Sequence, residues 1–225
     1  MILALDTSTH VWSVALVEGG KVLGECSWVS NYQARLSPTT IIAHLLSVYD
    51  KPMSALTGVA VAQGPGSFTG VRLGMAVAKG IALACQLPFY VVSTLDIVAH
   101  GLPTMFIQKG QLIYAVLAAG RGRFILGEYK LANSASCYES VKQPVLLAAH
   151  ELTHYFQQTE LSGQSAWLVG EVDELLTDEE FSLPQNIKLA PPTLRLHRAA
   201  TLALLALMHE PQDPITAVPF YIKEP

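Results

Sequence analysis

Gln63-Gly64-Pro65-Gly66-Ser67-Phe68-Thr69-Gly70 is the most informative motif of the chain for its fold class. An apolar run at 57–62 precedes it and predicts a short strand, and a longer apolar run at 71–86 follows it and predicts a helix. A glycine-rich turn that leads from a strand into a helix is typical of a mixed α/β domain. Such a turn can also hold an anion, because backbone N–H groups gather at a helix N-terminus.

Two interpretations of this loop stay open. It differs from a Walker loop, since no Lys-Ser/Thr pair follows Gly70, and its glycines are out of step with the dinucleotide fingerprint. In the first interpretation the loop and the end of the first strand face an anion or nucleotide, with an acidic residue that can hold a magnesium-bound water. The residues of this candidate site are Asp6, Thr7, Ser8, Gly64, Gly66, Ser67, Thr69 and Arg72. In the second, the glycines and the Asp-Thr-Ser run only shape tight turns.

Small residues recur every four positions along the helix that follows the loop, at Gly70, Gly74, Ala78 and Ala82. A glycine inside a helix costs about 1 kcal/mol relative to alanine, so two of them require a reason. A stripe of small residues lets another element approach closely. That element is either a helix of a partner or the sheet of the chain itself, and the pattern does not distinguish the two.

The chain before this loop predicts three antiparallel strands and a helix. The strands are expected at 2–6, 10–18 and 21–29, with a hairpin turn at Gly19-Gly20. Ser37-Pro38 predicts a helix start, and the helix over 37–49 carries an apolar stripe. The residues of that stripe are Ile41, Ile42, Leu45, Leu46 and Tyr49.

The second half of the chain repeats this order more faintly, which predicts two related domains, 1–102 and 103–225. Strands are expected at 111–118, 123–131 and 166–169, with helices at 147–159 and 194–209. The boundary falls in 101–110, which is rich in turn residues.

A second candidate site is His150-Glu151-Leu152-Thr153-His154, a literal H-E-x-x-H on a predicted helix. Two imidazoles one turn apart could hold zinc, with Glu151 as general base and Glu174 as a third ligand. This pattern supports an alternative function, a zinc metallohydrolase. In the alternative interpretation, the H-E-x-x-H pattern occurs by chance on a surface helix and binds no metal.

Composition favours a soluble, reduced protein that works in the cytoplasm. Fourteen basic and eighteen acidic residues give a net charge of −4, which argues against nucleic-acid binding by the chain alone. Three scattered cysteines form no disulfide framework. The segment 71–87, with Arg72 and Lys79, is expected to be too short and too charged to span a membrane. With 51% hydrophobic and only 14% charged residues, the chain is expected to cover apolar surface with a partner.

Three motifs together closely resemble the TsaB family of the bacterial machinery that makes threonylcarbamoyladenosine in tRNA, next to the anticodon. They are the run from Ile2 to Ser8, the run Gly64-Pro65-Gly66-Ser67-Phe68-Thr69-Gly70-Val71-Arg72-Leu73-Gly74, and Val92-Ser93-Thr94-Leu95. Pro219-Phe220-Tyr221-Ile222-Lys223 is similar to the closing element of that family. The resemblance covers most of the chain, most specifically up to Leu95.

The resemblance implies a two-domain actin-like α/β fold with mixed sheets and a degenerate second domain. It also implies a non-catalytic subunit with no metal and no cofactor. Members of the family pair with TsaD, the transferring subunit, through the two helices that correspond here to 37–49 and 70–86, and the ATPase TsaE docks on the pair. Transfer RNA is reached only through the complex, and a homodimer forms when the subunit is alone. The implied partner interface consists of the two stripes above: Ile41, Ile42, Leu45, Leu46, Tyr49, Gly70, Gly74, Ala78 and Ala82.

The chain departs from the family pattern at two places. Arg35-Leu36-Ser37-Pro38 stands where the family has an R-H-S-E-like run, and Ala119-Gly120-Arg121 stands where D-A-R is common. The missing carboxylate argues further against nucleotide or metal binding.

Overall fold

The computed structural model describes residues 1–30, 36–132 and 137–222, and it divides into two compact units. Unit 1 comprises Met1–Ile97 and His197–Tyr221, and unit 2 comprises Val98–Leu196 and Ile222–Pro225. Arg35 and Lys223, which belong to two of the motifs above, lie outside the described residues. Each unit is a mixed α/β structure and is described by itself.

Unit 1 is built on a five-stranded mixed sheet with the order β3-β2-β1-β4-β5. The strands are β1 (Ile2–Asp6), β2 (Val11–Glu18), β3 (Lys21–Val29), β4 (Gly58–Ala62) and β5 (Phe89–Val92). β1 is antiparallel to β2 and parallel to β4, so it lies at the centre of the sheet. Its five residues are all buried, as a central strand covered on both faces requires.

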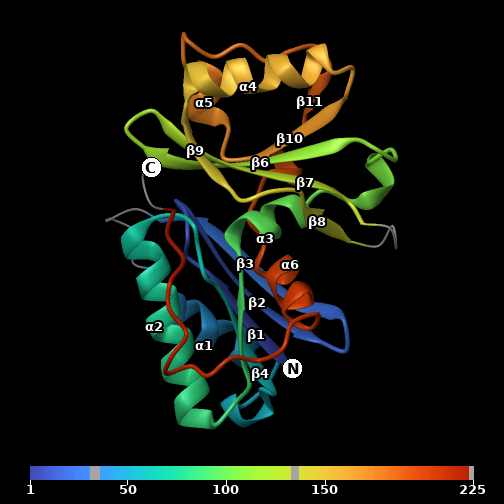
Figure 1. The fold of residues 1–225 in the computed structure, drawn as a ribbon. Helices are drawn as coiled ribbons and strands as arrows, with labels where there is room; N and C mark the ends of the chain where they lie inside the picture. Colours follow the sequence, from blue (N-terminus) through green and yellow to red (C-terminus); the bar gives the residue numbers. More distant parts are fainter. Residues whose placement is uncertain (31–35, 133–136, 223–225) are drawn as a thin grey trace. The chain divides into compact units, whose positions relative to one another are not determined.

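Two helices pack on one face of this sheet, α1 (Pro38–Val48) and α2 (Phe68–Cys85), as Figure 1 shows. The Ser37 side chain caps α1 by accepting a hydrogen bond from the Thr40 N–H, and Pro38 occupies the first turn, as the sequence predicts. Ser67 caps α2 in the same way, accepting from the Gly70 N–H. The predicted order of strands and helices in this part of the chain is therefore confirmed.

The other face of the same sheet is covered by α6 (Ala199–Ala206), which comes from the far end of the chain. Six of its eight residues are buried in a cluster with Ile2, Ala4 and Ala15. The division expected from the sequence places 103–225 in a second domain, whereas the structure returns His197–Tyr221 to unit 1. Because α6 is almost wholly apolar, most of its surface must be buried. The small side chains on this face of the sheet let the helix pack closely against it.

Unit 2 has a six-stranded sheet of order β11-β10-β6-β7-β8, with β9 also paired to β7. The strands are β6 (Leu112–Gly120), β7 (Arg123–Leu131), β8 (Tyr138–Ser140), β9 (Val145–Ala148), β10 (Ala166–Gly170) and β11 (Ile187–Leu189). The helices are α4 (Ala149–Leu161) and α5 (Asp173–Thr177). α3 (Thr94–His100) spans the division between the units, and three 3-10 turns are formed by Met53–Ala55, Thr104–Phe106 and Pro192–Leu194.

The two sheets share one strand order, which confirms the fold class predicted from the sequence: two actin-like α/β domains with mixed sheets. β6, β7, β10 and β11 of unit 2 take the places of β1, β2, β4 and β5 of unit 1, with the same parallel and antiparallel pairings. The second domain is reduced in two places. Two short strands, β8 and β9, share the position of β3, and the five-residue α5 stands where unit 1 has the 18-residue α2.

α2 is long and apolar enough to cross a membrane by length and composition alone. The sequence-based judgement that this segment is too short and too charged to span was therefore too strict. The core helix of a soluble protein passes the same test, and α2 buries Gly70, Val71, Gly74, Met75 and Ala78 against its own sheet.

Buried tyrosines make unit 2 sensitive to alkaline pH. Burial raises the pKa of Tyr114, which is 1% exposed, and of Tyr138 to about 12 each. Because the folded-state pKa lies above the unfolded value near 10, this stability is fully present below about pH 10 and is lost as the pH rises toward 12. For Tyr114 it amounts to about 2–3 kcal/mol. Urea unfolding from pH 8 to 11.5 is expected to show this loss, with a shallower decline in Tyr114→Phe; equal slopes in both proteins would refute it.

Candidate functional site

The end of β1 is joined to the glycine loop by buried hydrogen bonds. Asp6 Oδ1 accepts from the Ser8 N–H (2.9 Å) and from the Ser8 hydroxyl (2.6 Å), so this carboxylate closes a local turn. The Ser8 carbonyl in turn accepts from the Ser67 N–H at 2.6 Å. Asp6 is fully buried, and within the described part of the chain its Oδ2 makes no hydrogen bond. The structure therefore brings the loop and the end of β1 together, as the sequence predicts.

The glycines of the loop and of α2 are explained by this close approach. A Cβ on Gly66 would lie 2.2 Å from the Ser8 carbonyl oxygen, and one on Gly70 would lie 2.0 Å from that of Thr7. A Cβ on Gly74 would lie 2.4 Å from Thr7 Oγ1, the hydroxyl that donates to the Gly70 carbonyl at 2.7 Å. These positions exclude any side chain. The contacts favour the second interpretation of the loop, in which the glycines shape a tight turn against β1.

The stripe of small residues consequently faces the chain's own sheet. Gly70, Gly74, Ala78 and Ala82 are all buried within unit 1. The apolar stripe of α1 is buried in the same core, with exposed fractions of 4–7%. Eight of the nine residues chosen from the sequence as a partner interface are thus internal, and only Tyr49, at 36%, is exposed. This corrects the choice of residues: the apolar periodicity marks the inner faces of the two helices.

A second apolar surface lies on the outer face of α2, and sequence reasoning missed it. We call it the outer stripe and define it by five exposed residues at helical spacing. They are Thr69, Leu73, Ala76, Gly80 and Leu83. Leu73 is 36% and Leu83 51% exposed, and a Cβ on Gly80 would meet no atom within 4 Å. Because apolar residues occur on every side of α2, periodicity alone did not separate the inner from the outer face.

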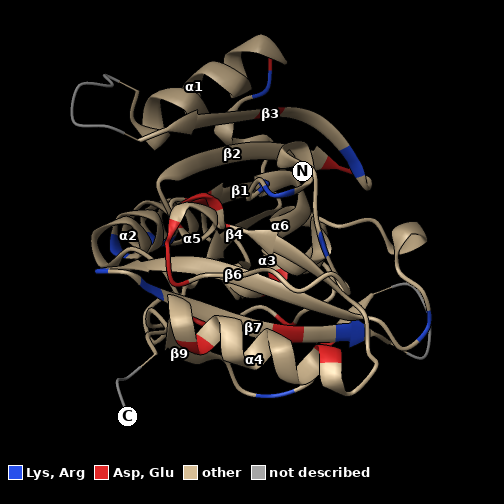
Figure 2. Ribbon diagram, turned by 90° about the horizontal axis from the view of Figure 1, so that it is seen from above, with Lys and Arg blue, Asp and Glu red and all other residues tan. Residues whose placement is uncertain are grey.

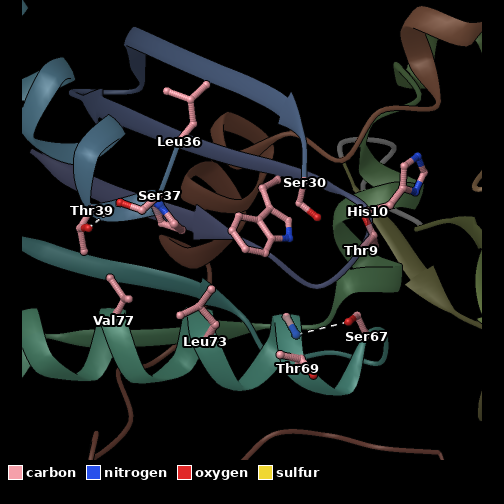
Figure 3. Close-up of a pocket in the computed structure, with 13 residues that line it drawn as sticks. Thr9, His10, Ser30, Leu36, Ser37, Thr39, Ser67, Thr69, Leu73 and Val77 are labelled. Atoms are coloured by element: carbon pink, nitrogen blue, oxygen red, sulfur yellow. Dashed lines mark hydrogen bonds between the residues drawn. The ribbon is translucent and has the colours of Figure 1, made fainter. Parts of the chain in front are cut away.

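A groove of about 650 Å³ runs beside the outer stripe (Figure 3). Thr69, Leu73 and Val77 point into it from α2, and Ser37 and Thr39 border it from the start of α1. Its remaining lining residues come from β2 and the turn before it, the residue after β3, the glycine loop, and the starts of α1 and α2: Thr9, His10, Trp12, Ser30, Leu36, Pro38, Ser67 and Gly70. The groove is apolar with a hydroxyl-bearing rim, which suits a protein side-chain surface better than a charged ligand.

Charge is scarce on both helices. α1 carries no charged residue and α2 carries only Arg72 and Lys79, so both are tan over most of their length in Figure 2. Arg72, part of the predicted anion site, packs its guanidinium 3.6 Å from the centroid of the Phe68 ring, and its Nε donates to the Tyr221 hydroxyl at 3.2 Å. Arg72 is therefore engaged with aromatic neighbours on the flank of α2.

The H-E-x-x-H motif lies on α4 of unit 2, at the surface. Glu151 Oε2 accepts from the Ala148 N–H at 2.7 Å, which caps the helix. His150 Nδ1 lies 3.3 Å from Glu180 Oε2, and His154 Nε2 hydrogen-bonds Gln158 at 3.1 Å. Among the described residues, no three His, Cys, Asp or Glu side chains converge here or elsewhere in a way that could hold a metal ion. The geometry gives these residues local structural roles and does not favour the zinc hydrolase.

Comparison with known proteins gives consistent matches over most of the chain. A family model described as TsaD, tRNA N6-adenosine threonylcarbamoyltransferase, matches residues 31–205. The tRNA threonylcarbamoyladenosine biosynthesis protein TsaB of Escherichia coli (strain K12) is 31% identical over 202 residues, which cover 84% of each chain. TsaB of Bacillus subtilis (strain 168) is 30% identical over 178 residues, 71% of this chain and 75% of that one.

A solved structure supports the same relationship. YeaZ from Pseudomonas aeruginosa superposes with a TM-score of 0.77 at 25% identity, covering 98% of this chain and 99% of its own. Motifs, fold and comparisons thus agree. The chain belongs to the TsaB family of tRNA threonylcarbamoyladenosine biosynthesis proteins, within the wider family that the TsaD model describes.

Proposed function

We propose that this chain is a non-catalytic subunit that pairs with TsaD and supports the docking of TsaE on the pair. Its family takes part in tRNA threonylcarbamoyladenosine biosynthesis in bacteria. In this proposal the subunit works in the cytoplasm, needs no cofactor, and meets tRNA only within the complex. The net charge of −4 agrees with the last point, since tRNA binding by a lone chain would require clustered basic residues.

One observation carries the proposal: a solvent-exposed, uncharged stripe on an 18-residue helix, bordered by an apolar groove. Apolar side chains gathered along one exposed face mark a protein interaction site more often than chance exposure. A helix of a partner can place its own side chains into such a groove. The two helices that the sequence predicts to dock, α1 and α2, remain the docking helices in this proposal. The proposed docking surface is on their outer faces, because their inner faces are buried. The same surface is expected to pair two copies of the chain when TsaD is absent.

The non-catalytic assignment draws on the loop. In this chain Thr7 and Ser8 pack into the glycine loop, against the positions of Gly66, Gly70 and Gly74. Two ionisable side chains beside the loop have local partners: Asp6 Oδ1 accepts from Ser8, and Arg72 contacts Phe68 and Tyr221. Catalysis would require a free acid, base or bound metal at this place.

The proposal is tested by mixing the purified chain with TsaD. Size exclusion with light scattering is expected to show a heterodimer, and a threonylcarbamoyl-transfer assay on tRNA is expected to require TsaD. The isolated chain is expected to hydrolyse ATP weakly or not at all. Asp6→Ala is therefore expected to leave its rate of ATP hydrolysis unchanged. A chain that stays monomeric beside TsaD, or that transfers threonylcarbamoyl without it, would contradict the proposal.

A further inference from the structure

The last part of unit 1, residues 213–221, runs along α2, and we call it the strap (Figure 1). Hydrogen bonds tie it to the helix and the loop. Lys79 Nζ donates to the Ala217 carbonyl at 2.5 Å, and Gln63 Nε2 donates to the Val218 carbonyl at 2.8 Å. The Phe220 N–H donates to the Gln63 carbonyl at 2.9 Å. The strap thus contacts the start of the glycine loop at Gln63 and the second half of α2 at Lys79.

The end of the strap is held by aromatic contacts. The rings of Phe68 and Tyr221 lie 5.4 Å apart between centroids, and Arg72 bridges them through its cation–π contact and its hydrogen bond to the Tyr221 hydroxyl. Such a cluster adds attraction beyond buried area. It fixes the strap to the first turn of α2.

Hydrophobic burial holds the strap only weakly. Ile215 is 74% and Val218 64% exposed, and Ala217 is its one buried apolar side chain. Segments with few buried contacts open at low free-energy cost relative to the core. The seating of the strap therefore depends on the side-chain ties to Lys79, Gln63, Arg72 and Phe68.

These ties act on a helix that already packs closely on the sheet. Its inner face buries Val71 and Met75 beside the small residues Gly70, Gly74, Ala78 and Ala82. At 100° per residue, Phe68, Arg72 and Lys79 lie along one flank of α2, whereas Val77 lines the groove on the other. The outer stripe lies between the two flanks. The strap adds contacts on the flank that the sheet does not hold, and it thereby opposes small rotations of α2 that would turn the stripe away from a partner.

We propose that the strap is a positioning element for partner docking: with the strap seated, α2 presents the outer stripe, and with the strap released, the affinity for the partner falls. This inference rests on the proposed pairing with TsaD. Lys79 and Tyr221 are the positioning residues, and neither needs to touch the partner.

The test measures TsaD affinity by calorimetry for the full chain and for variants in these ties. Lys79→Met keeps the length of the side chain and removes the donor, and it is expected to weaken binding about tenfold. Tyr221→Leu is expected to do the same, and Tyr221→Phe, which keeps the ring, is expected to weaken binding less. Val218→Ala is the matched control, because the Val218 side chain is exposed while its carbonyl makes the contact.

Hydrogen exchange of the unbound chain separates positioning from general damage. Amides of residues 64–79 are expected to exchange faster in Lys79→Met than in Val218→Ala, with no change in β1 or β4. If the wild type binds TsaD and all variants bind within twofold, the strap inference is wrong and the proposed function stands. If the wild type does not bind TsaD, the proposed function fails. In that case unchanged exchange in Lys79→Met would also overturn the role of the strap in holding α2.

Discussion

Replacing Gly70 with alanine is expected to destabilise unit 1 by about 3 kcal/mol or more, because the new Cβ would lie 2.0 Å from the Thr7 carbonyl oxygen. That oxygen belongs to the backbone at the end of β1, so no side-chain rotation relieves the clash. The melting temperature is expected to fall by about 6–12 °C, at 2–4 °C per kcal/mol. Calorimetric melting of the purified variant measures the effect directly.

Gly80→Ala is the matched control on the same helix. A Cβ there meets nothing within 4 Å, so the substitution is expected to raise the free energy of unfolding by about 1 kcal/mol through helix propensity alone. The opposite signs of the two substitutions test the assignment of inner and outer faces. Equal effects at both positions would show that the faces of α2 are misassigned.

Gly80→Arg is expected to weaken TsaD binding about 100-fold while the unbound chain stays folded. The position is exposed in the free chain, so a long side chain fits, but in the complex it would bring an unpaired charge into an apolar contact. A penalty of about 3 kcal/mol corresponds to that loss of affinity. Calorimetric titration with TsaD measures it, alongside a melting curve of the variant alone.

Val22→Arg provides the control for Gly80→Arg. Val22 is exposed at the start of β3, next to Lys21, so a further positive charge there leaves the outer stripe unchanged. Unchanged affinity in Gly80→Arg, or an equal loss in Val22→Arg, would place the docking surface elsewhere. A bulky substitution at Gly74 is unsuitable for this purpose, because its Cβ would contact Thr7 and report on folding instead.

The strands and helices of unit 1 could be predicted from the sequence because local signals coincide there. Ser37-Pro38 marks a helix start, Gly19-Gly20 a hairpin, and the apolar run of β4 ends at the glycine loop. In unit 2 the signals are weaker. β8 has two exposed residues of three, and α5 is five residues long, so neither carries a periodic pattern that sequence reasoning could detect.

The site was predicted in part. The sequence identified the two segments that meet, the end of β1 and the glycine loop, because each of them directly follows a predicted strand. It did not identify the direction of the small-residue stripe, since Gly70 and Gly74 suit a partner helix and the chain's own Thr7 equally well. It also missed α6 as part of unit 1, because the return of a distant segment to a sheet leaves no local pattern.

Site-specific photo-crosslinking shows which surface of the chain contacts TsaD. A benzoylphenylalanine placed at Ala76, in the middle of the outer stripe, is expected to crosslink to TsaD in the assembled complex, and one placed at His154 on α4 is expected not to. Crosslinking from His154 alone, or a stable complex without any crosslink from Ala76, would show that TsaD does not dock on the outer face of α2.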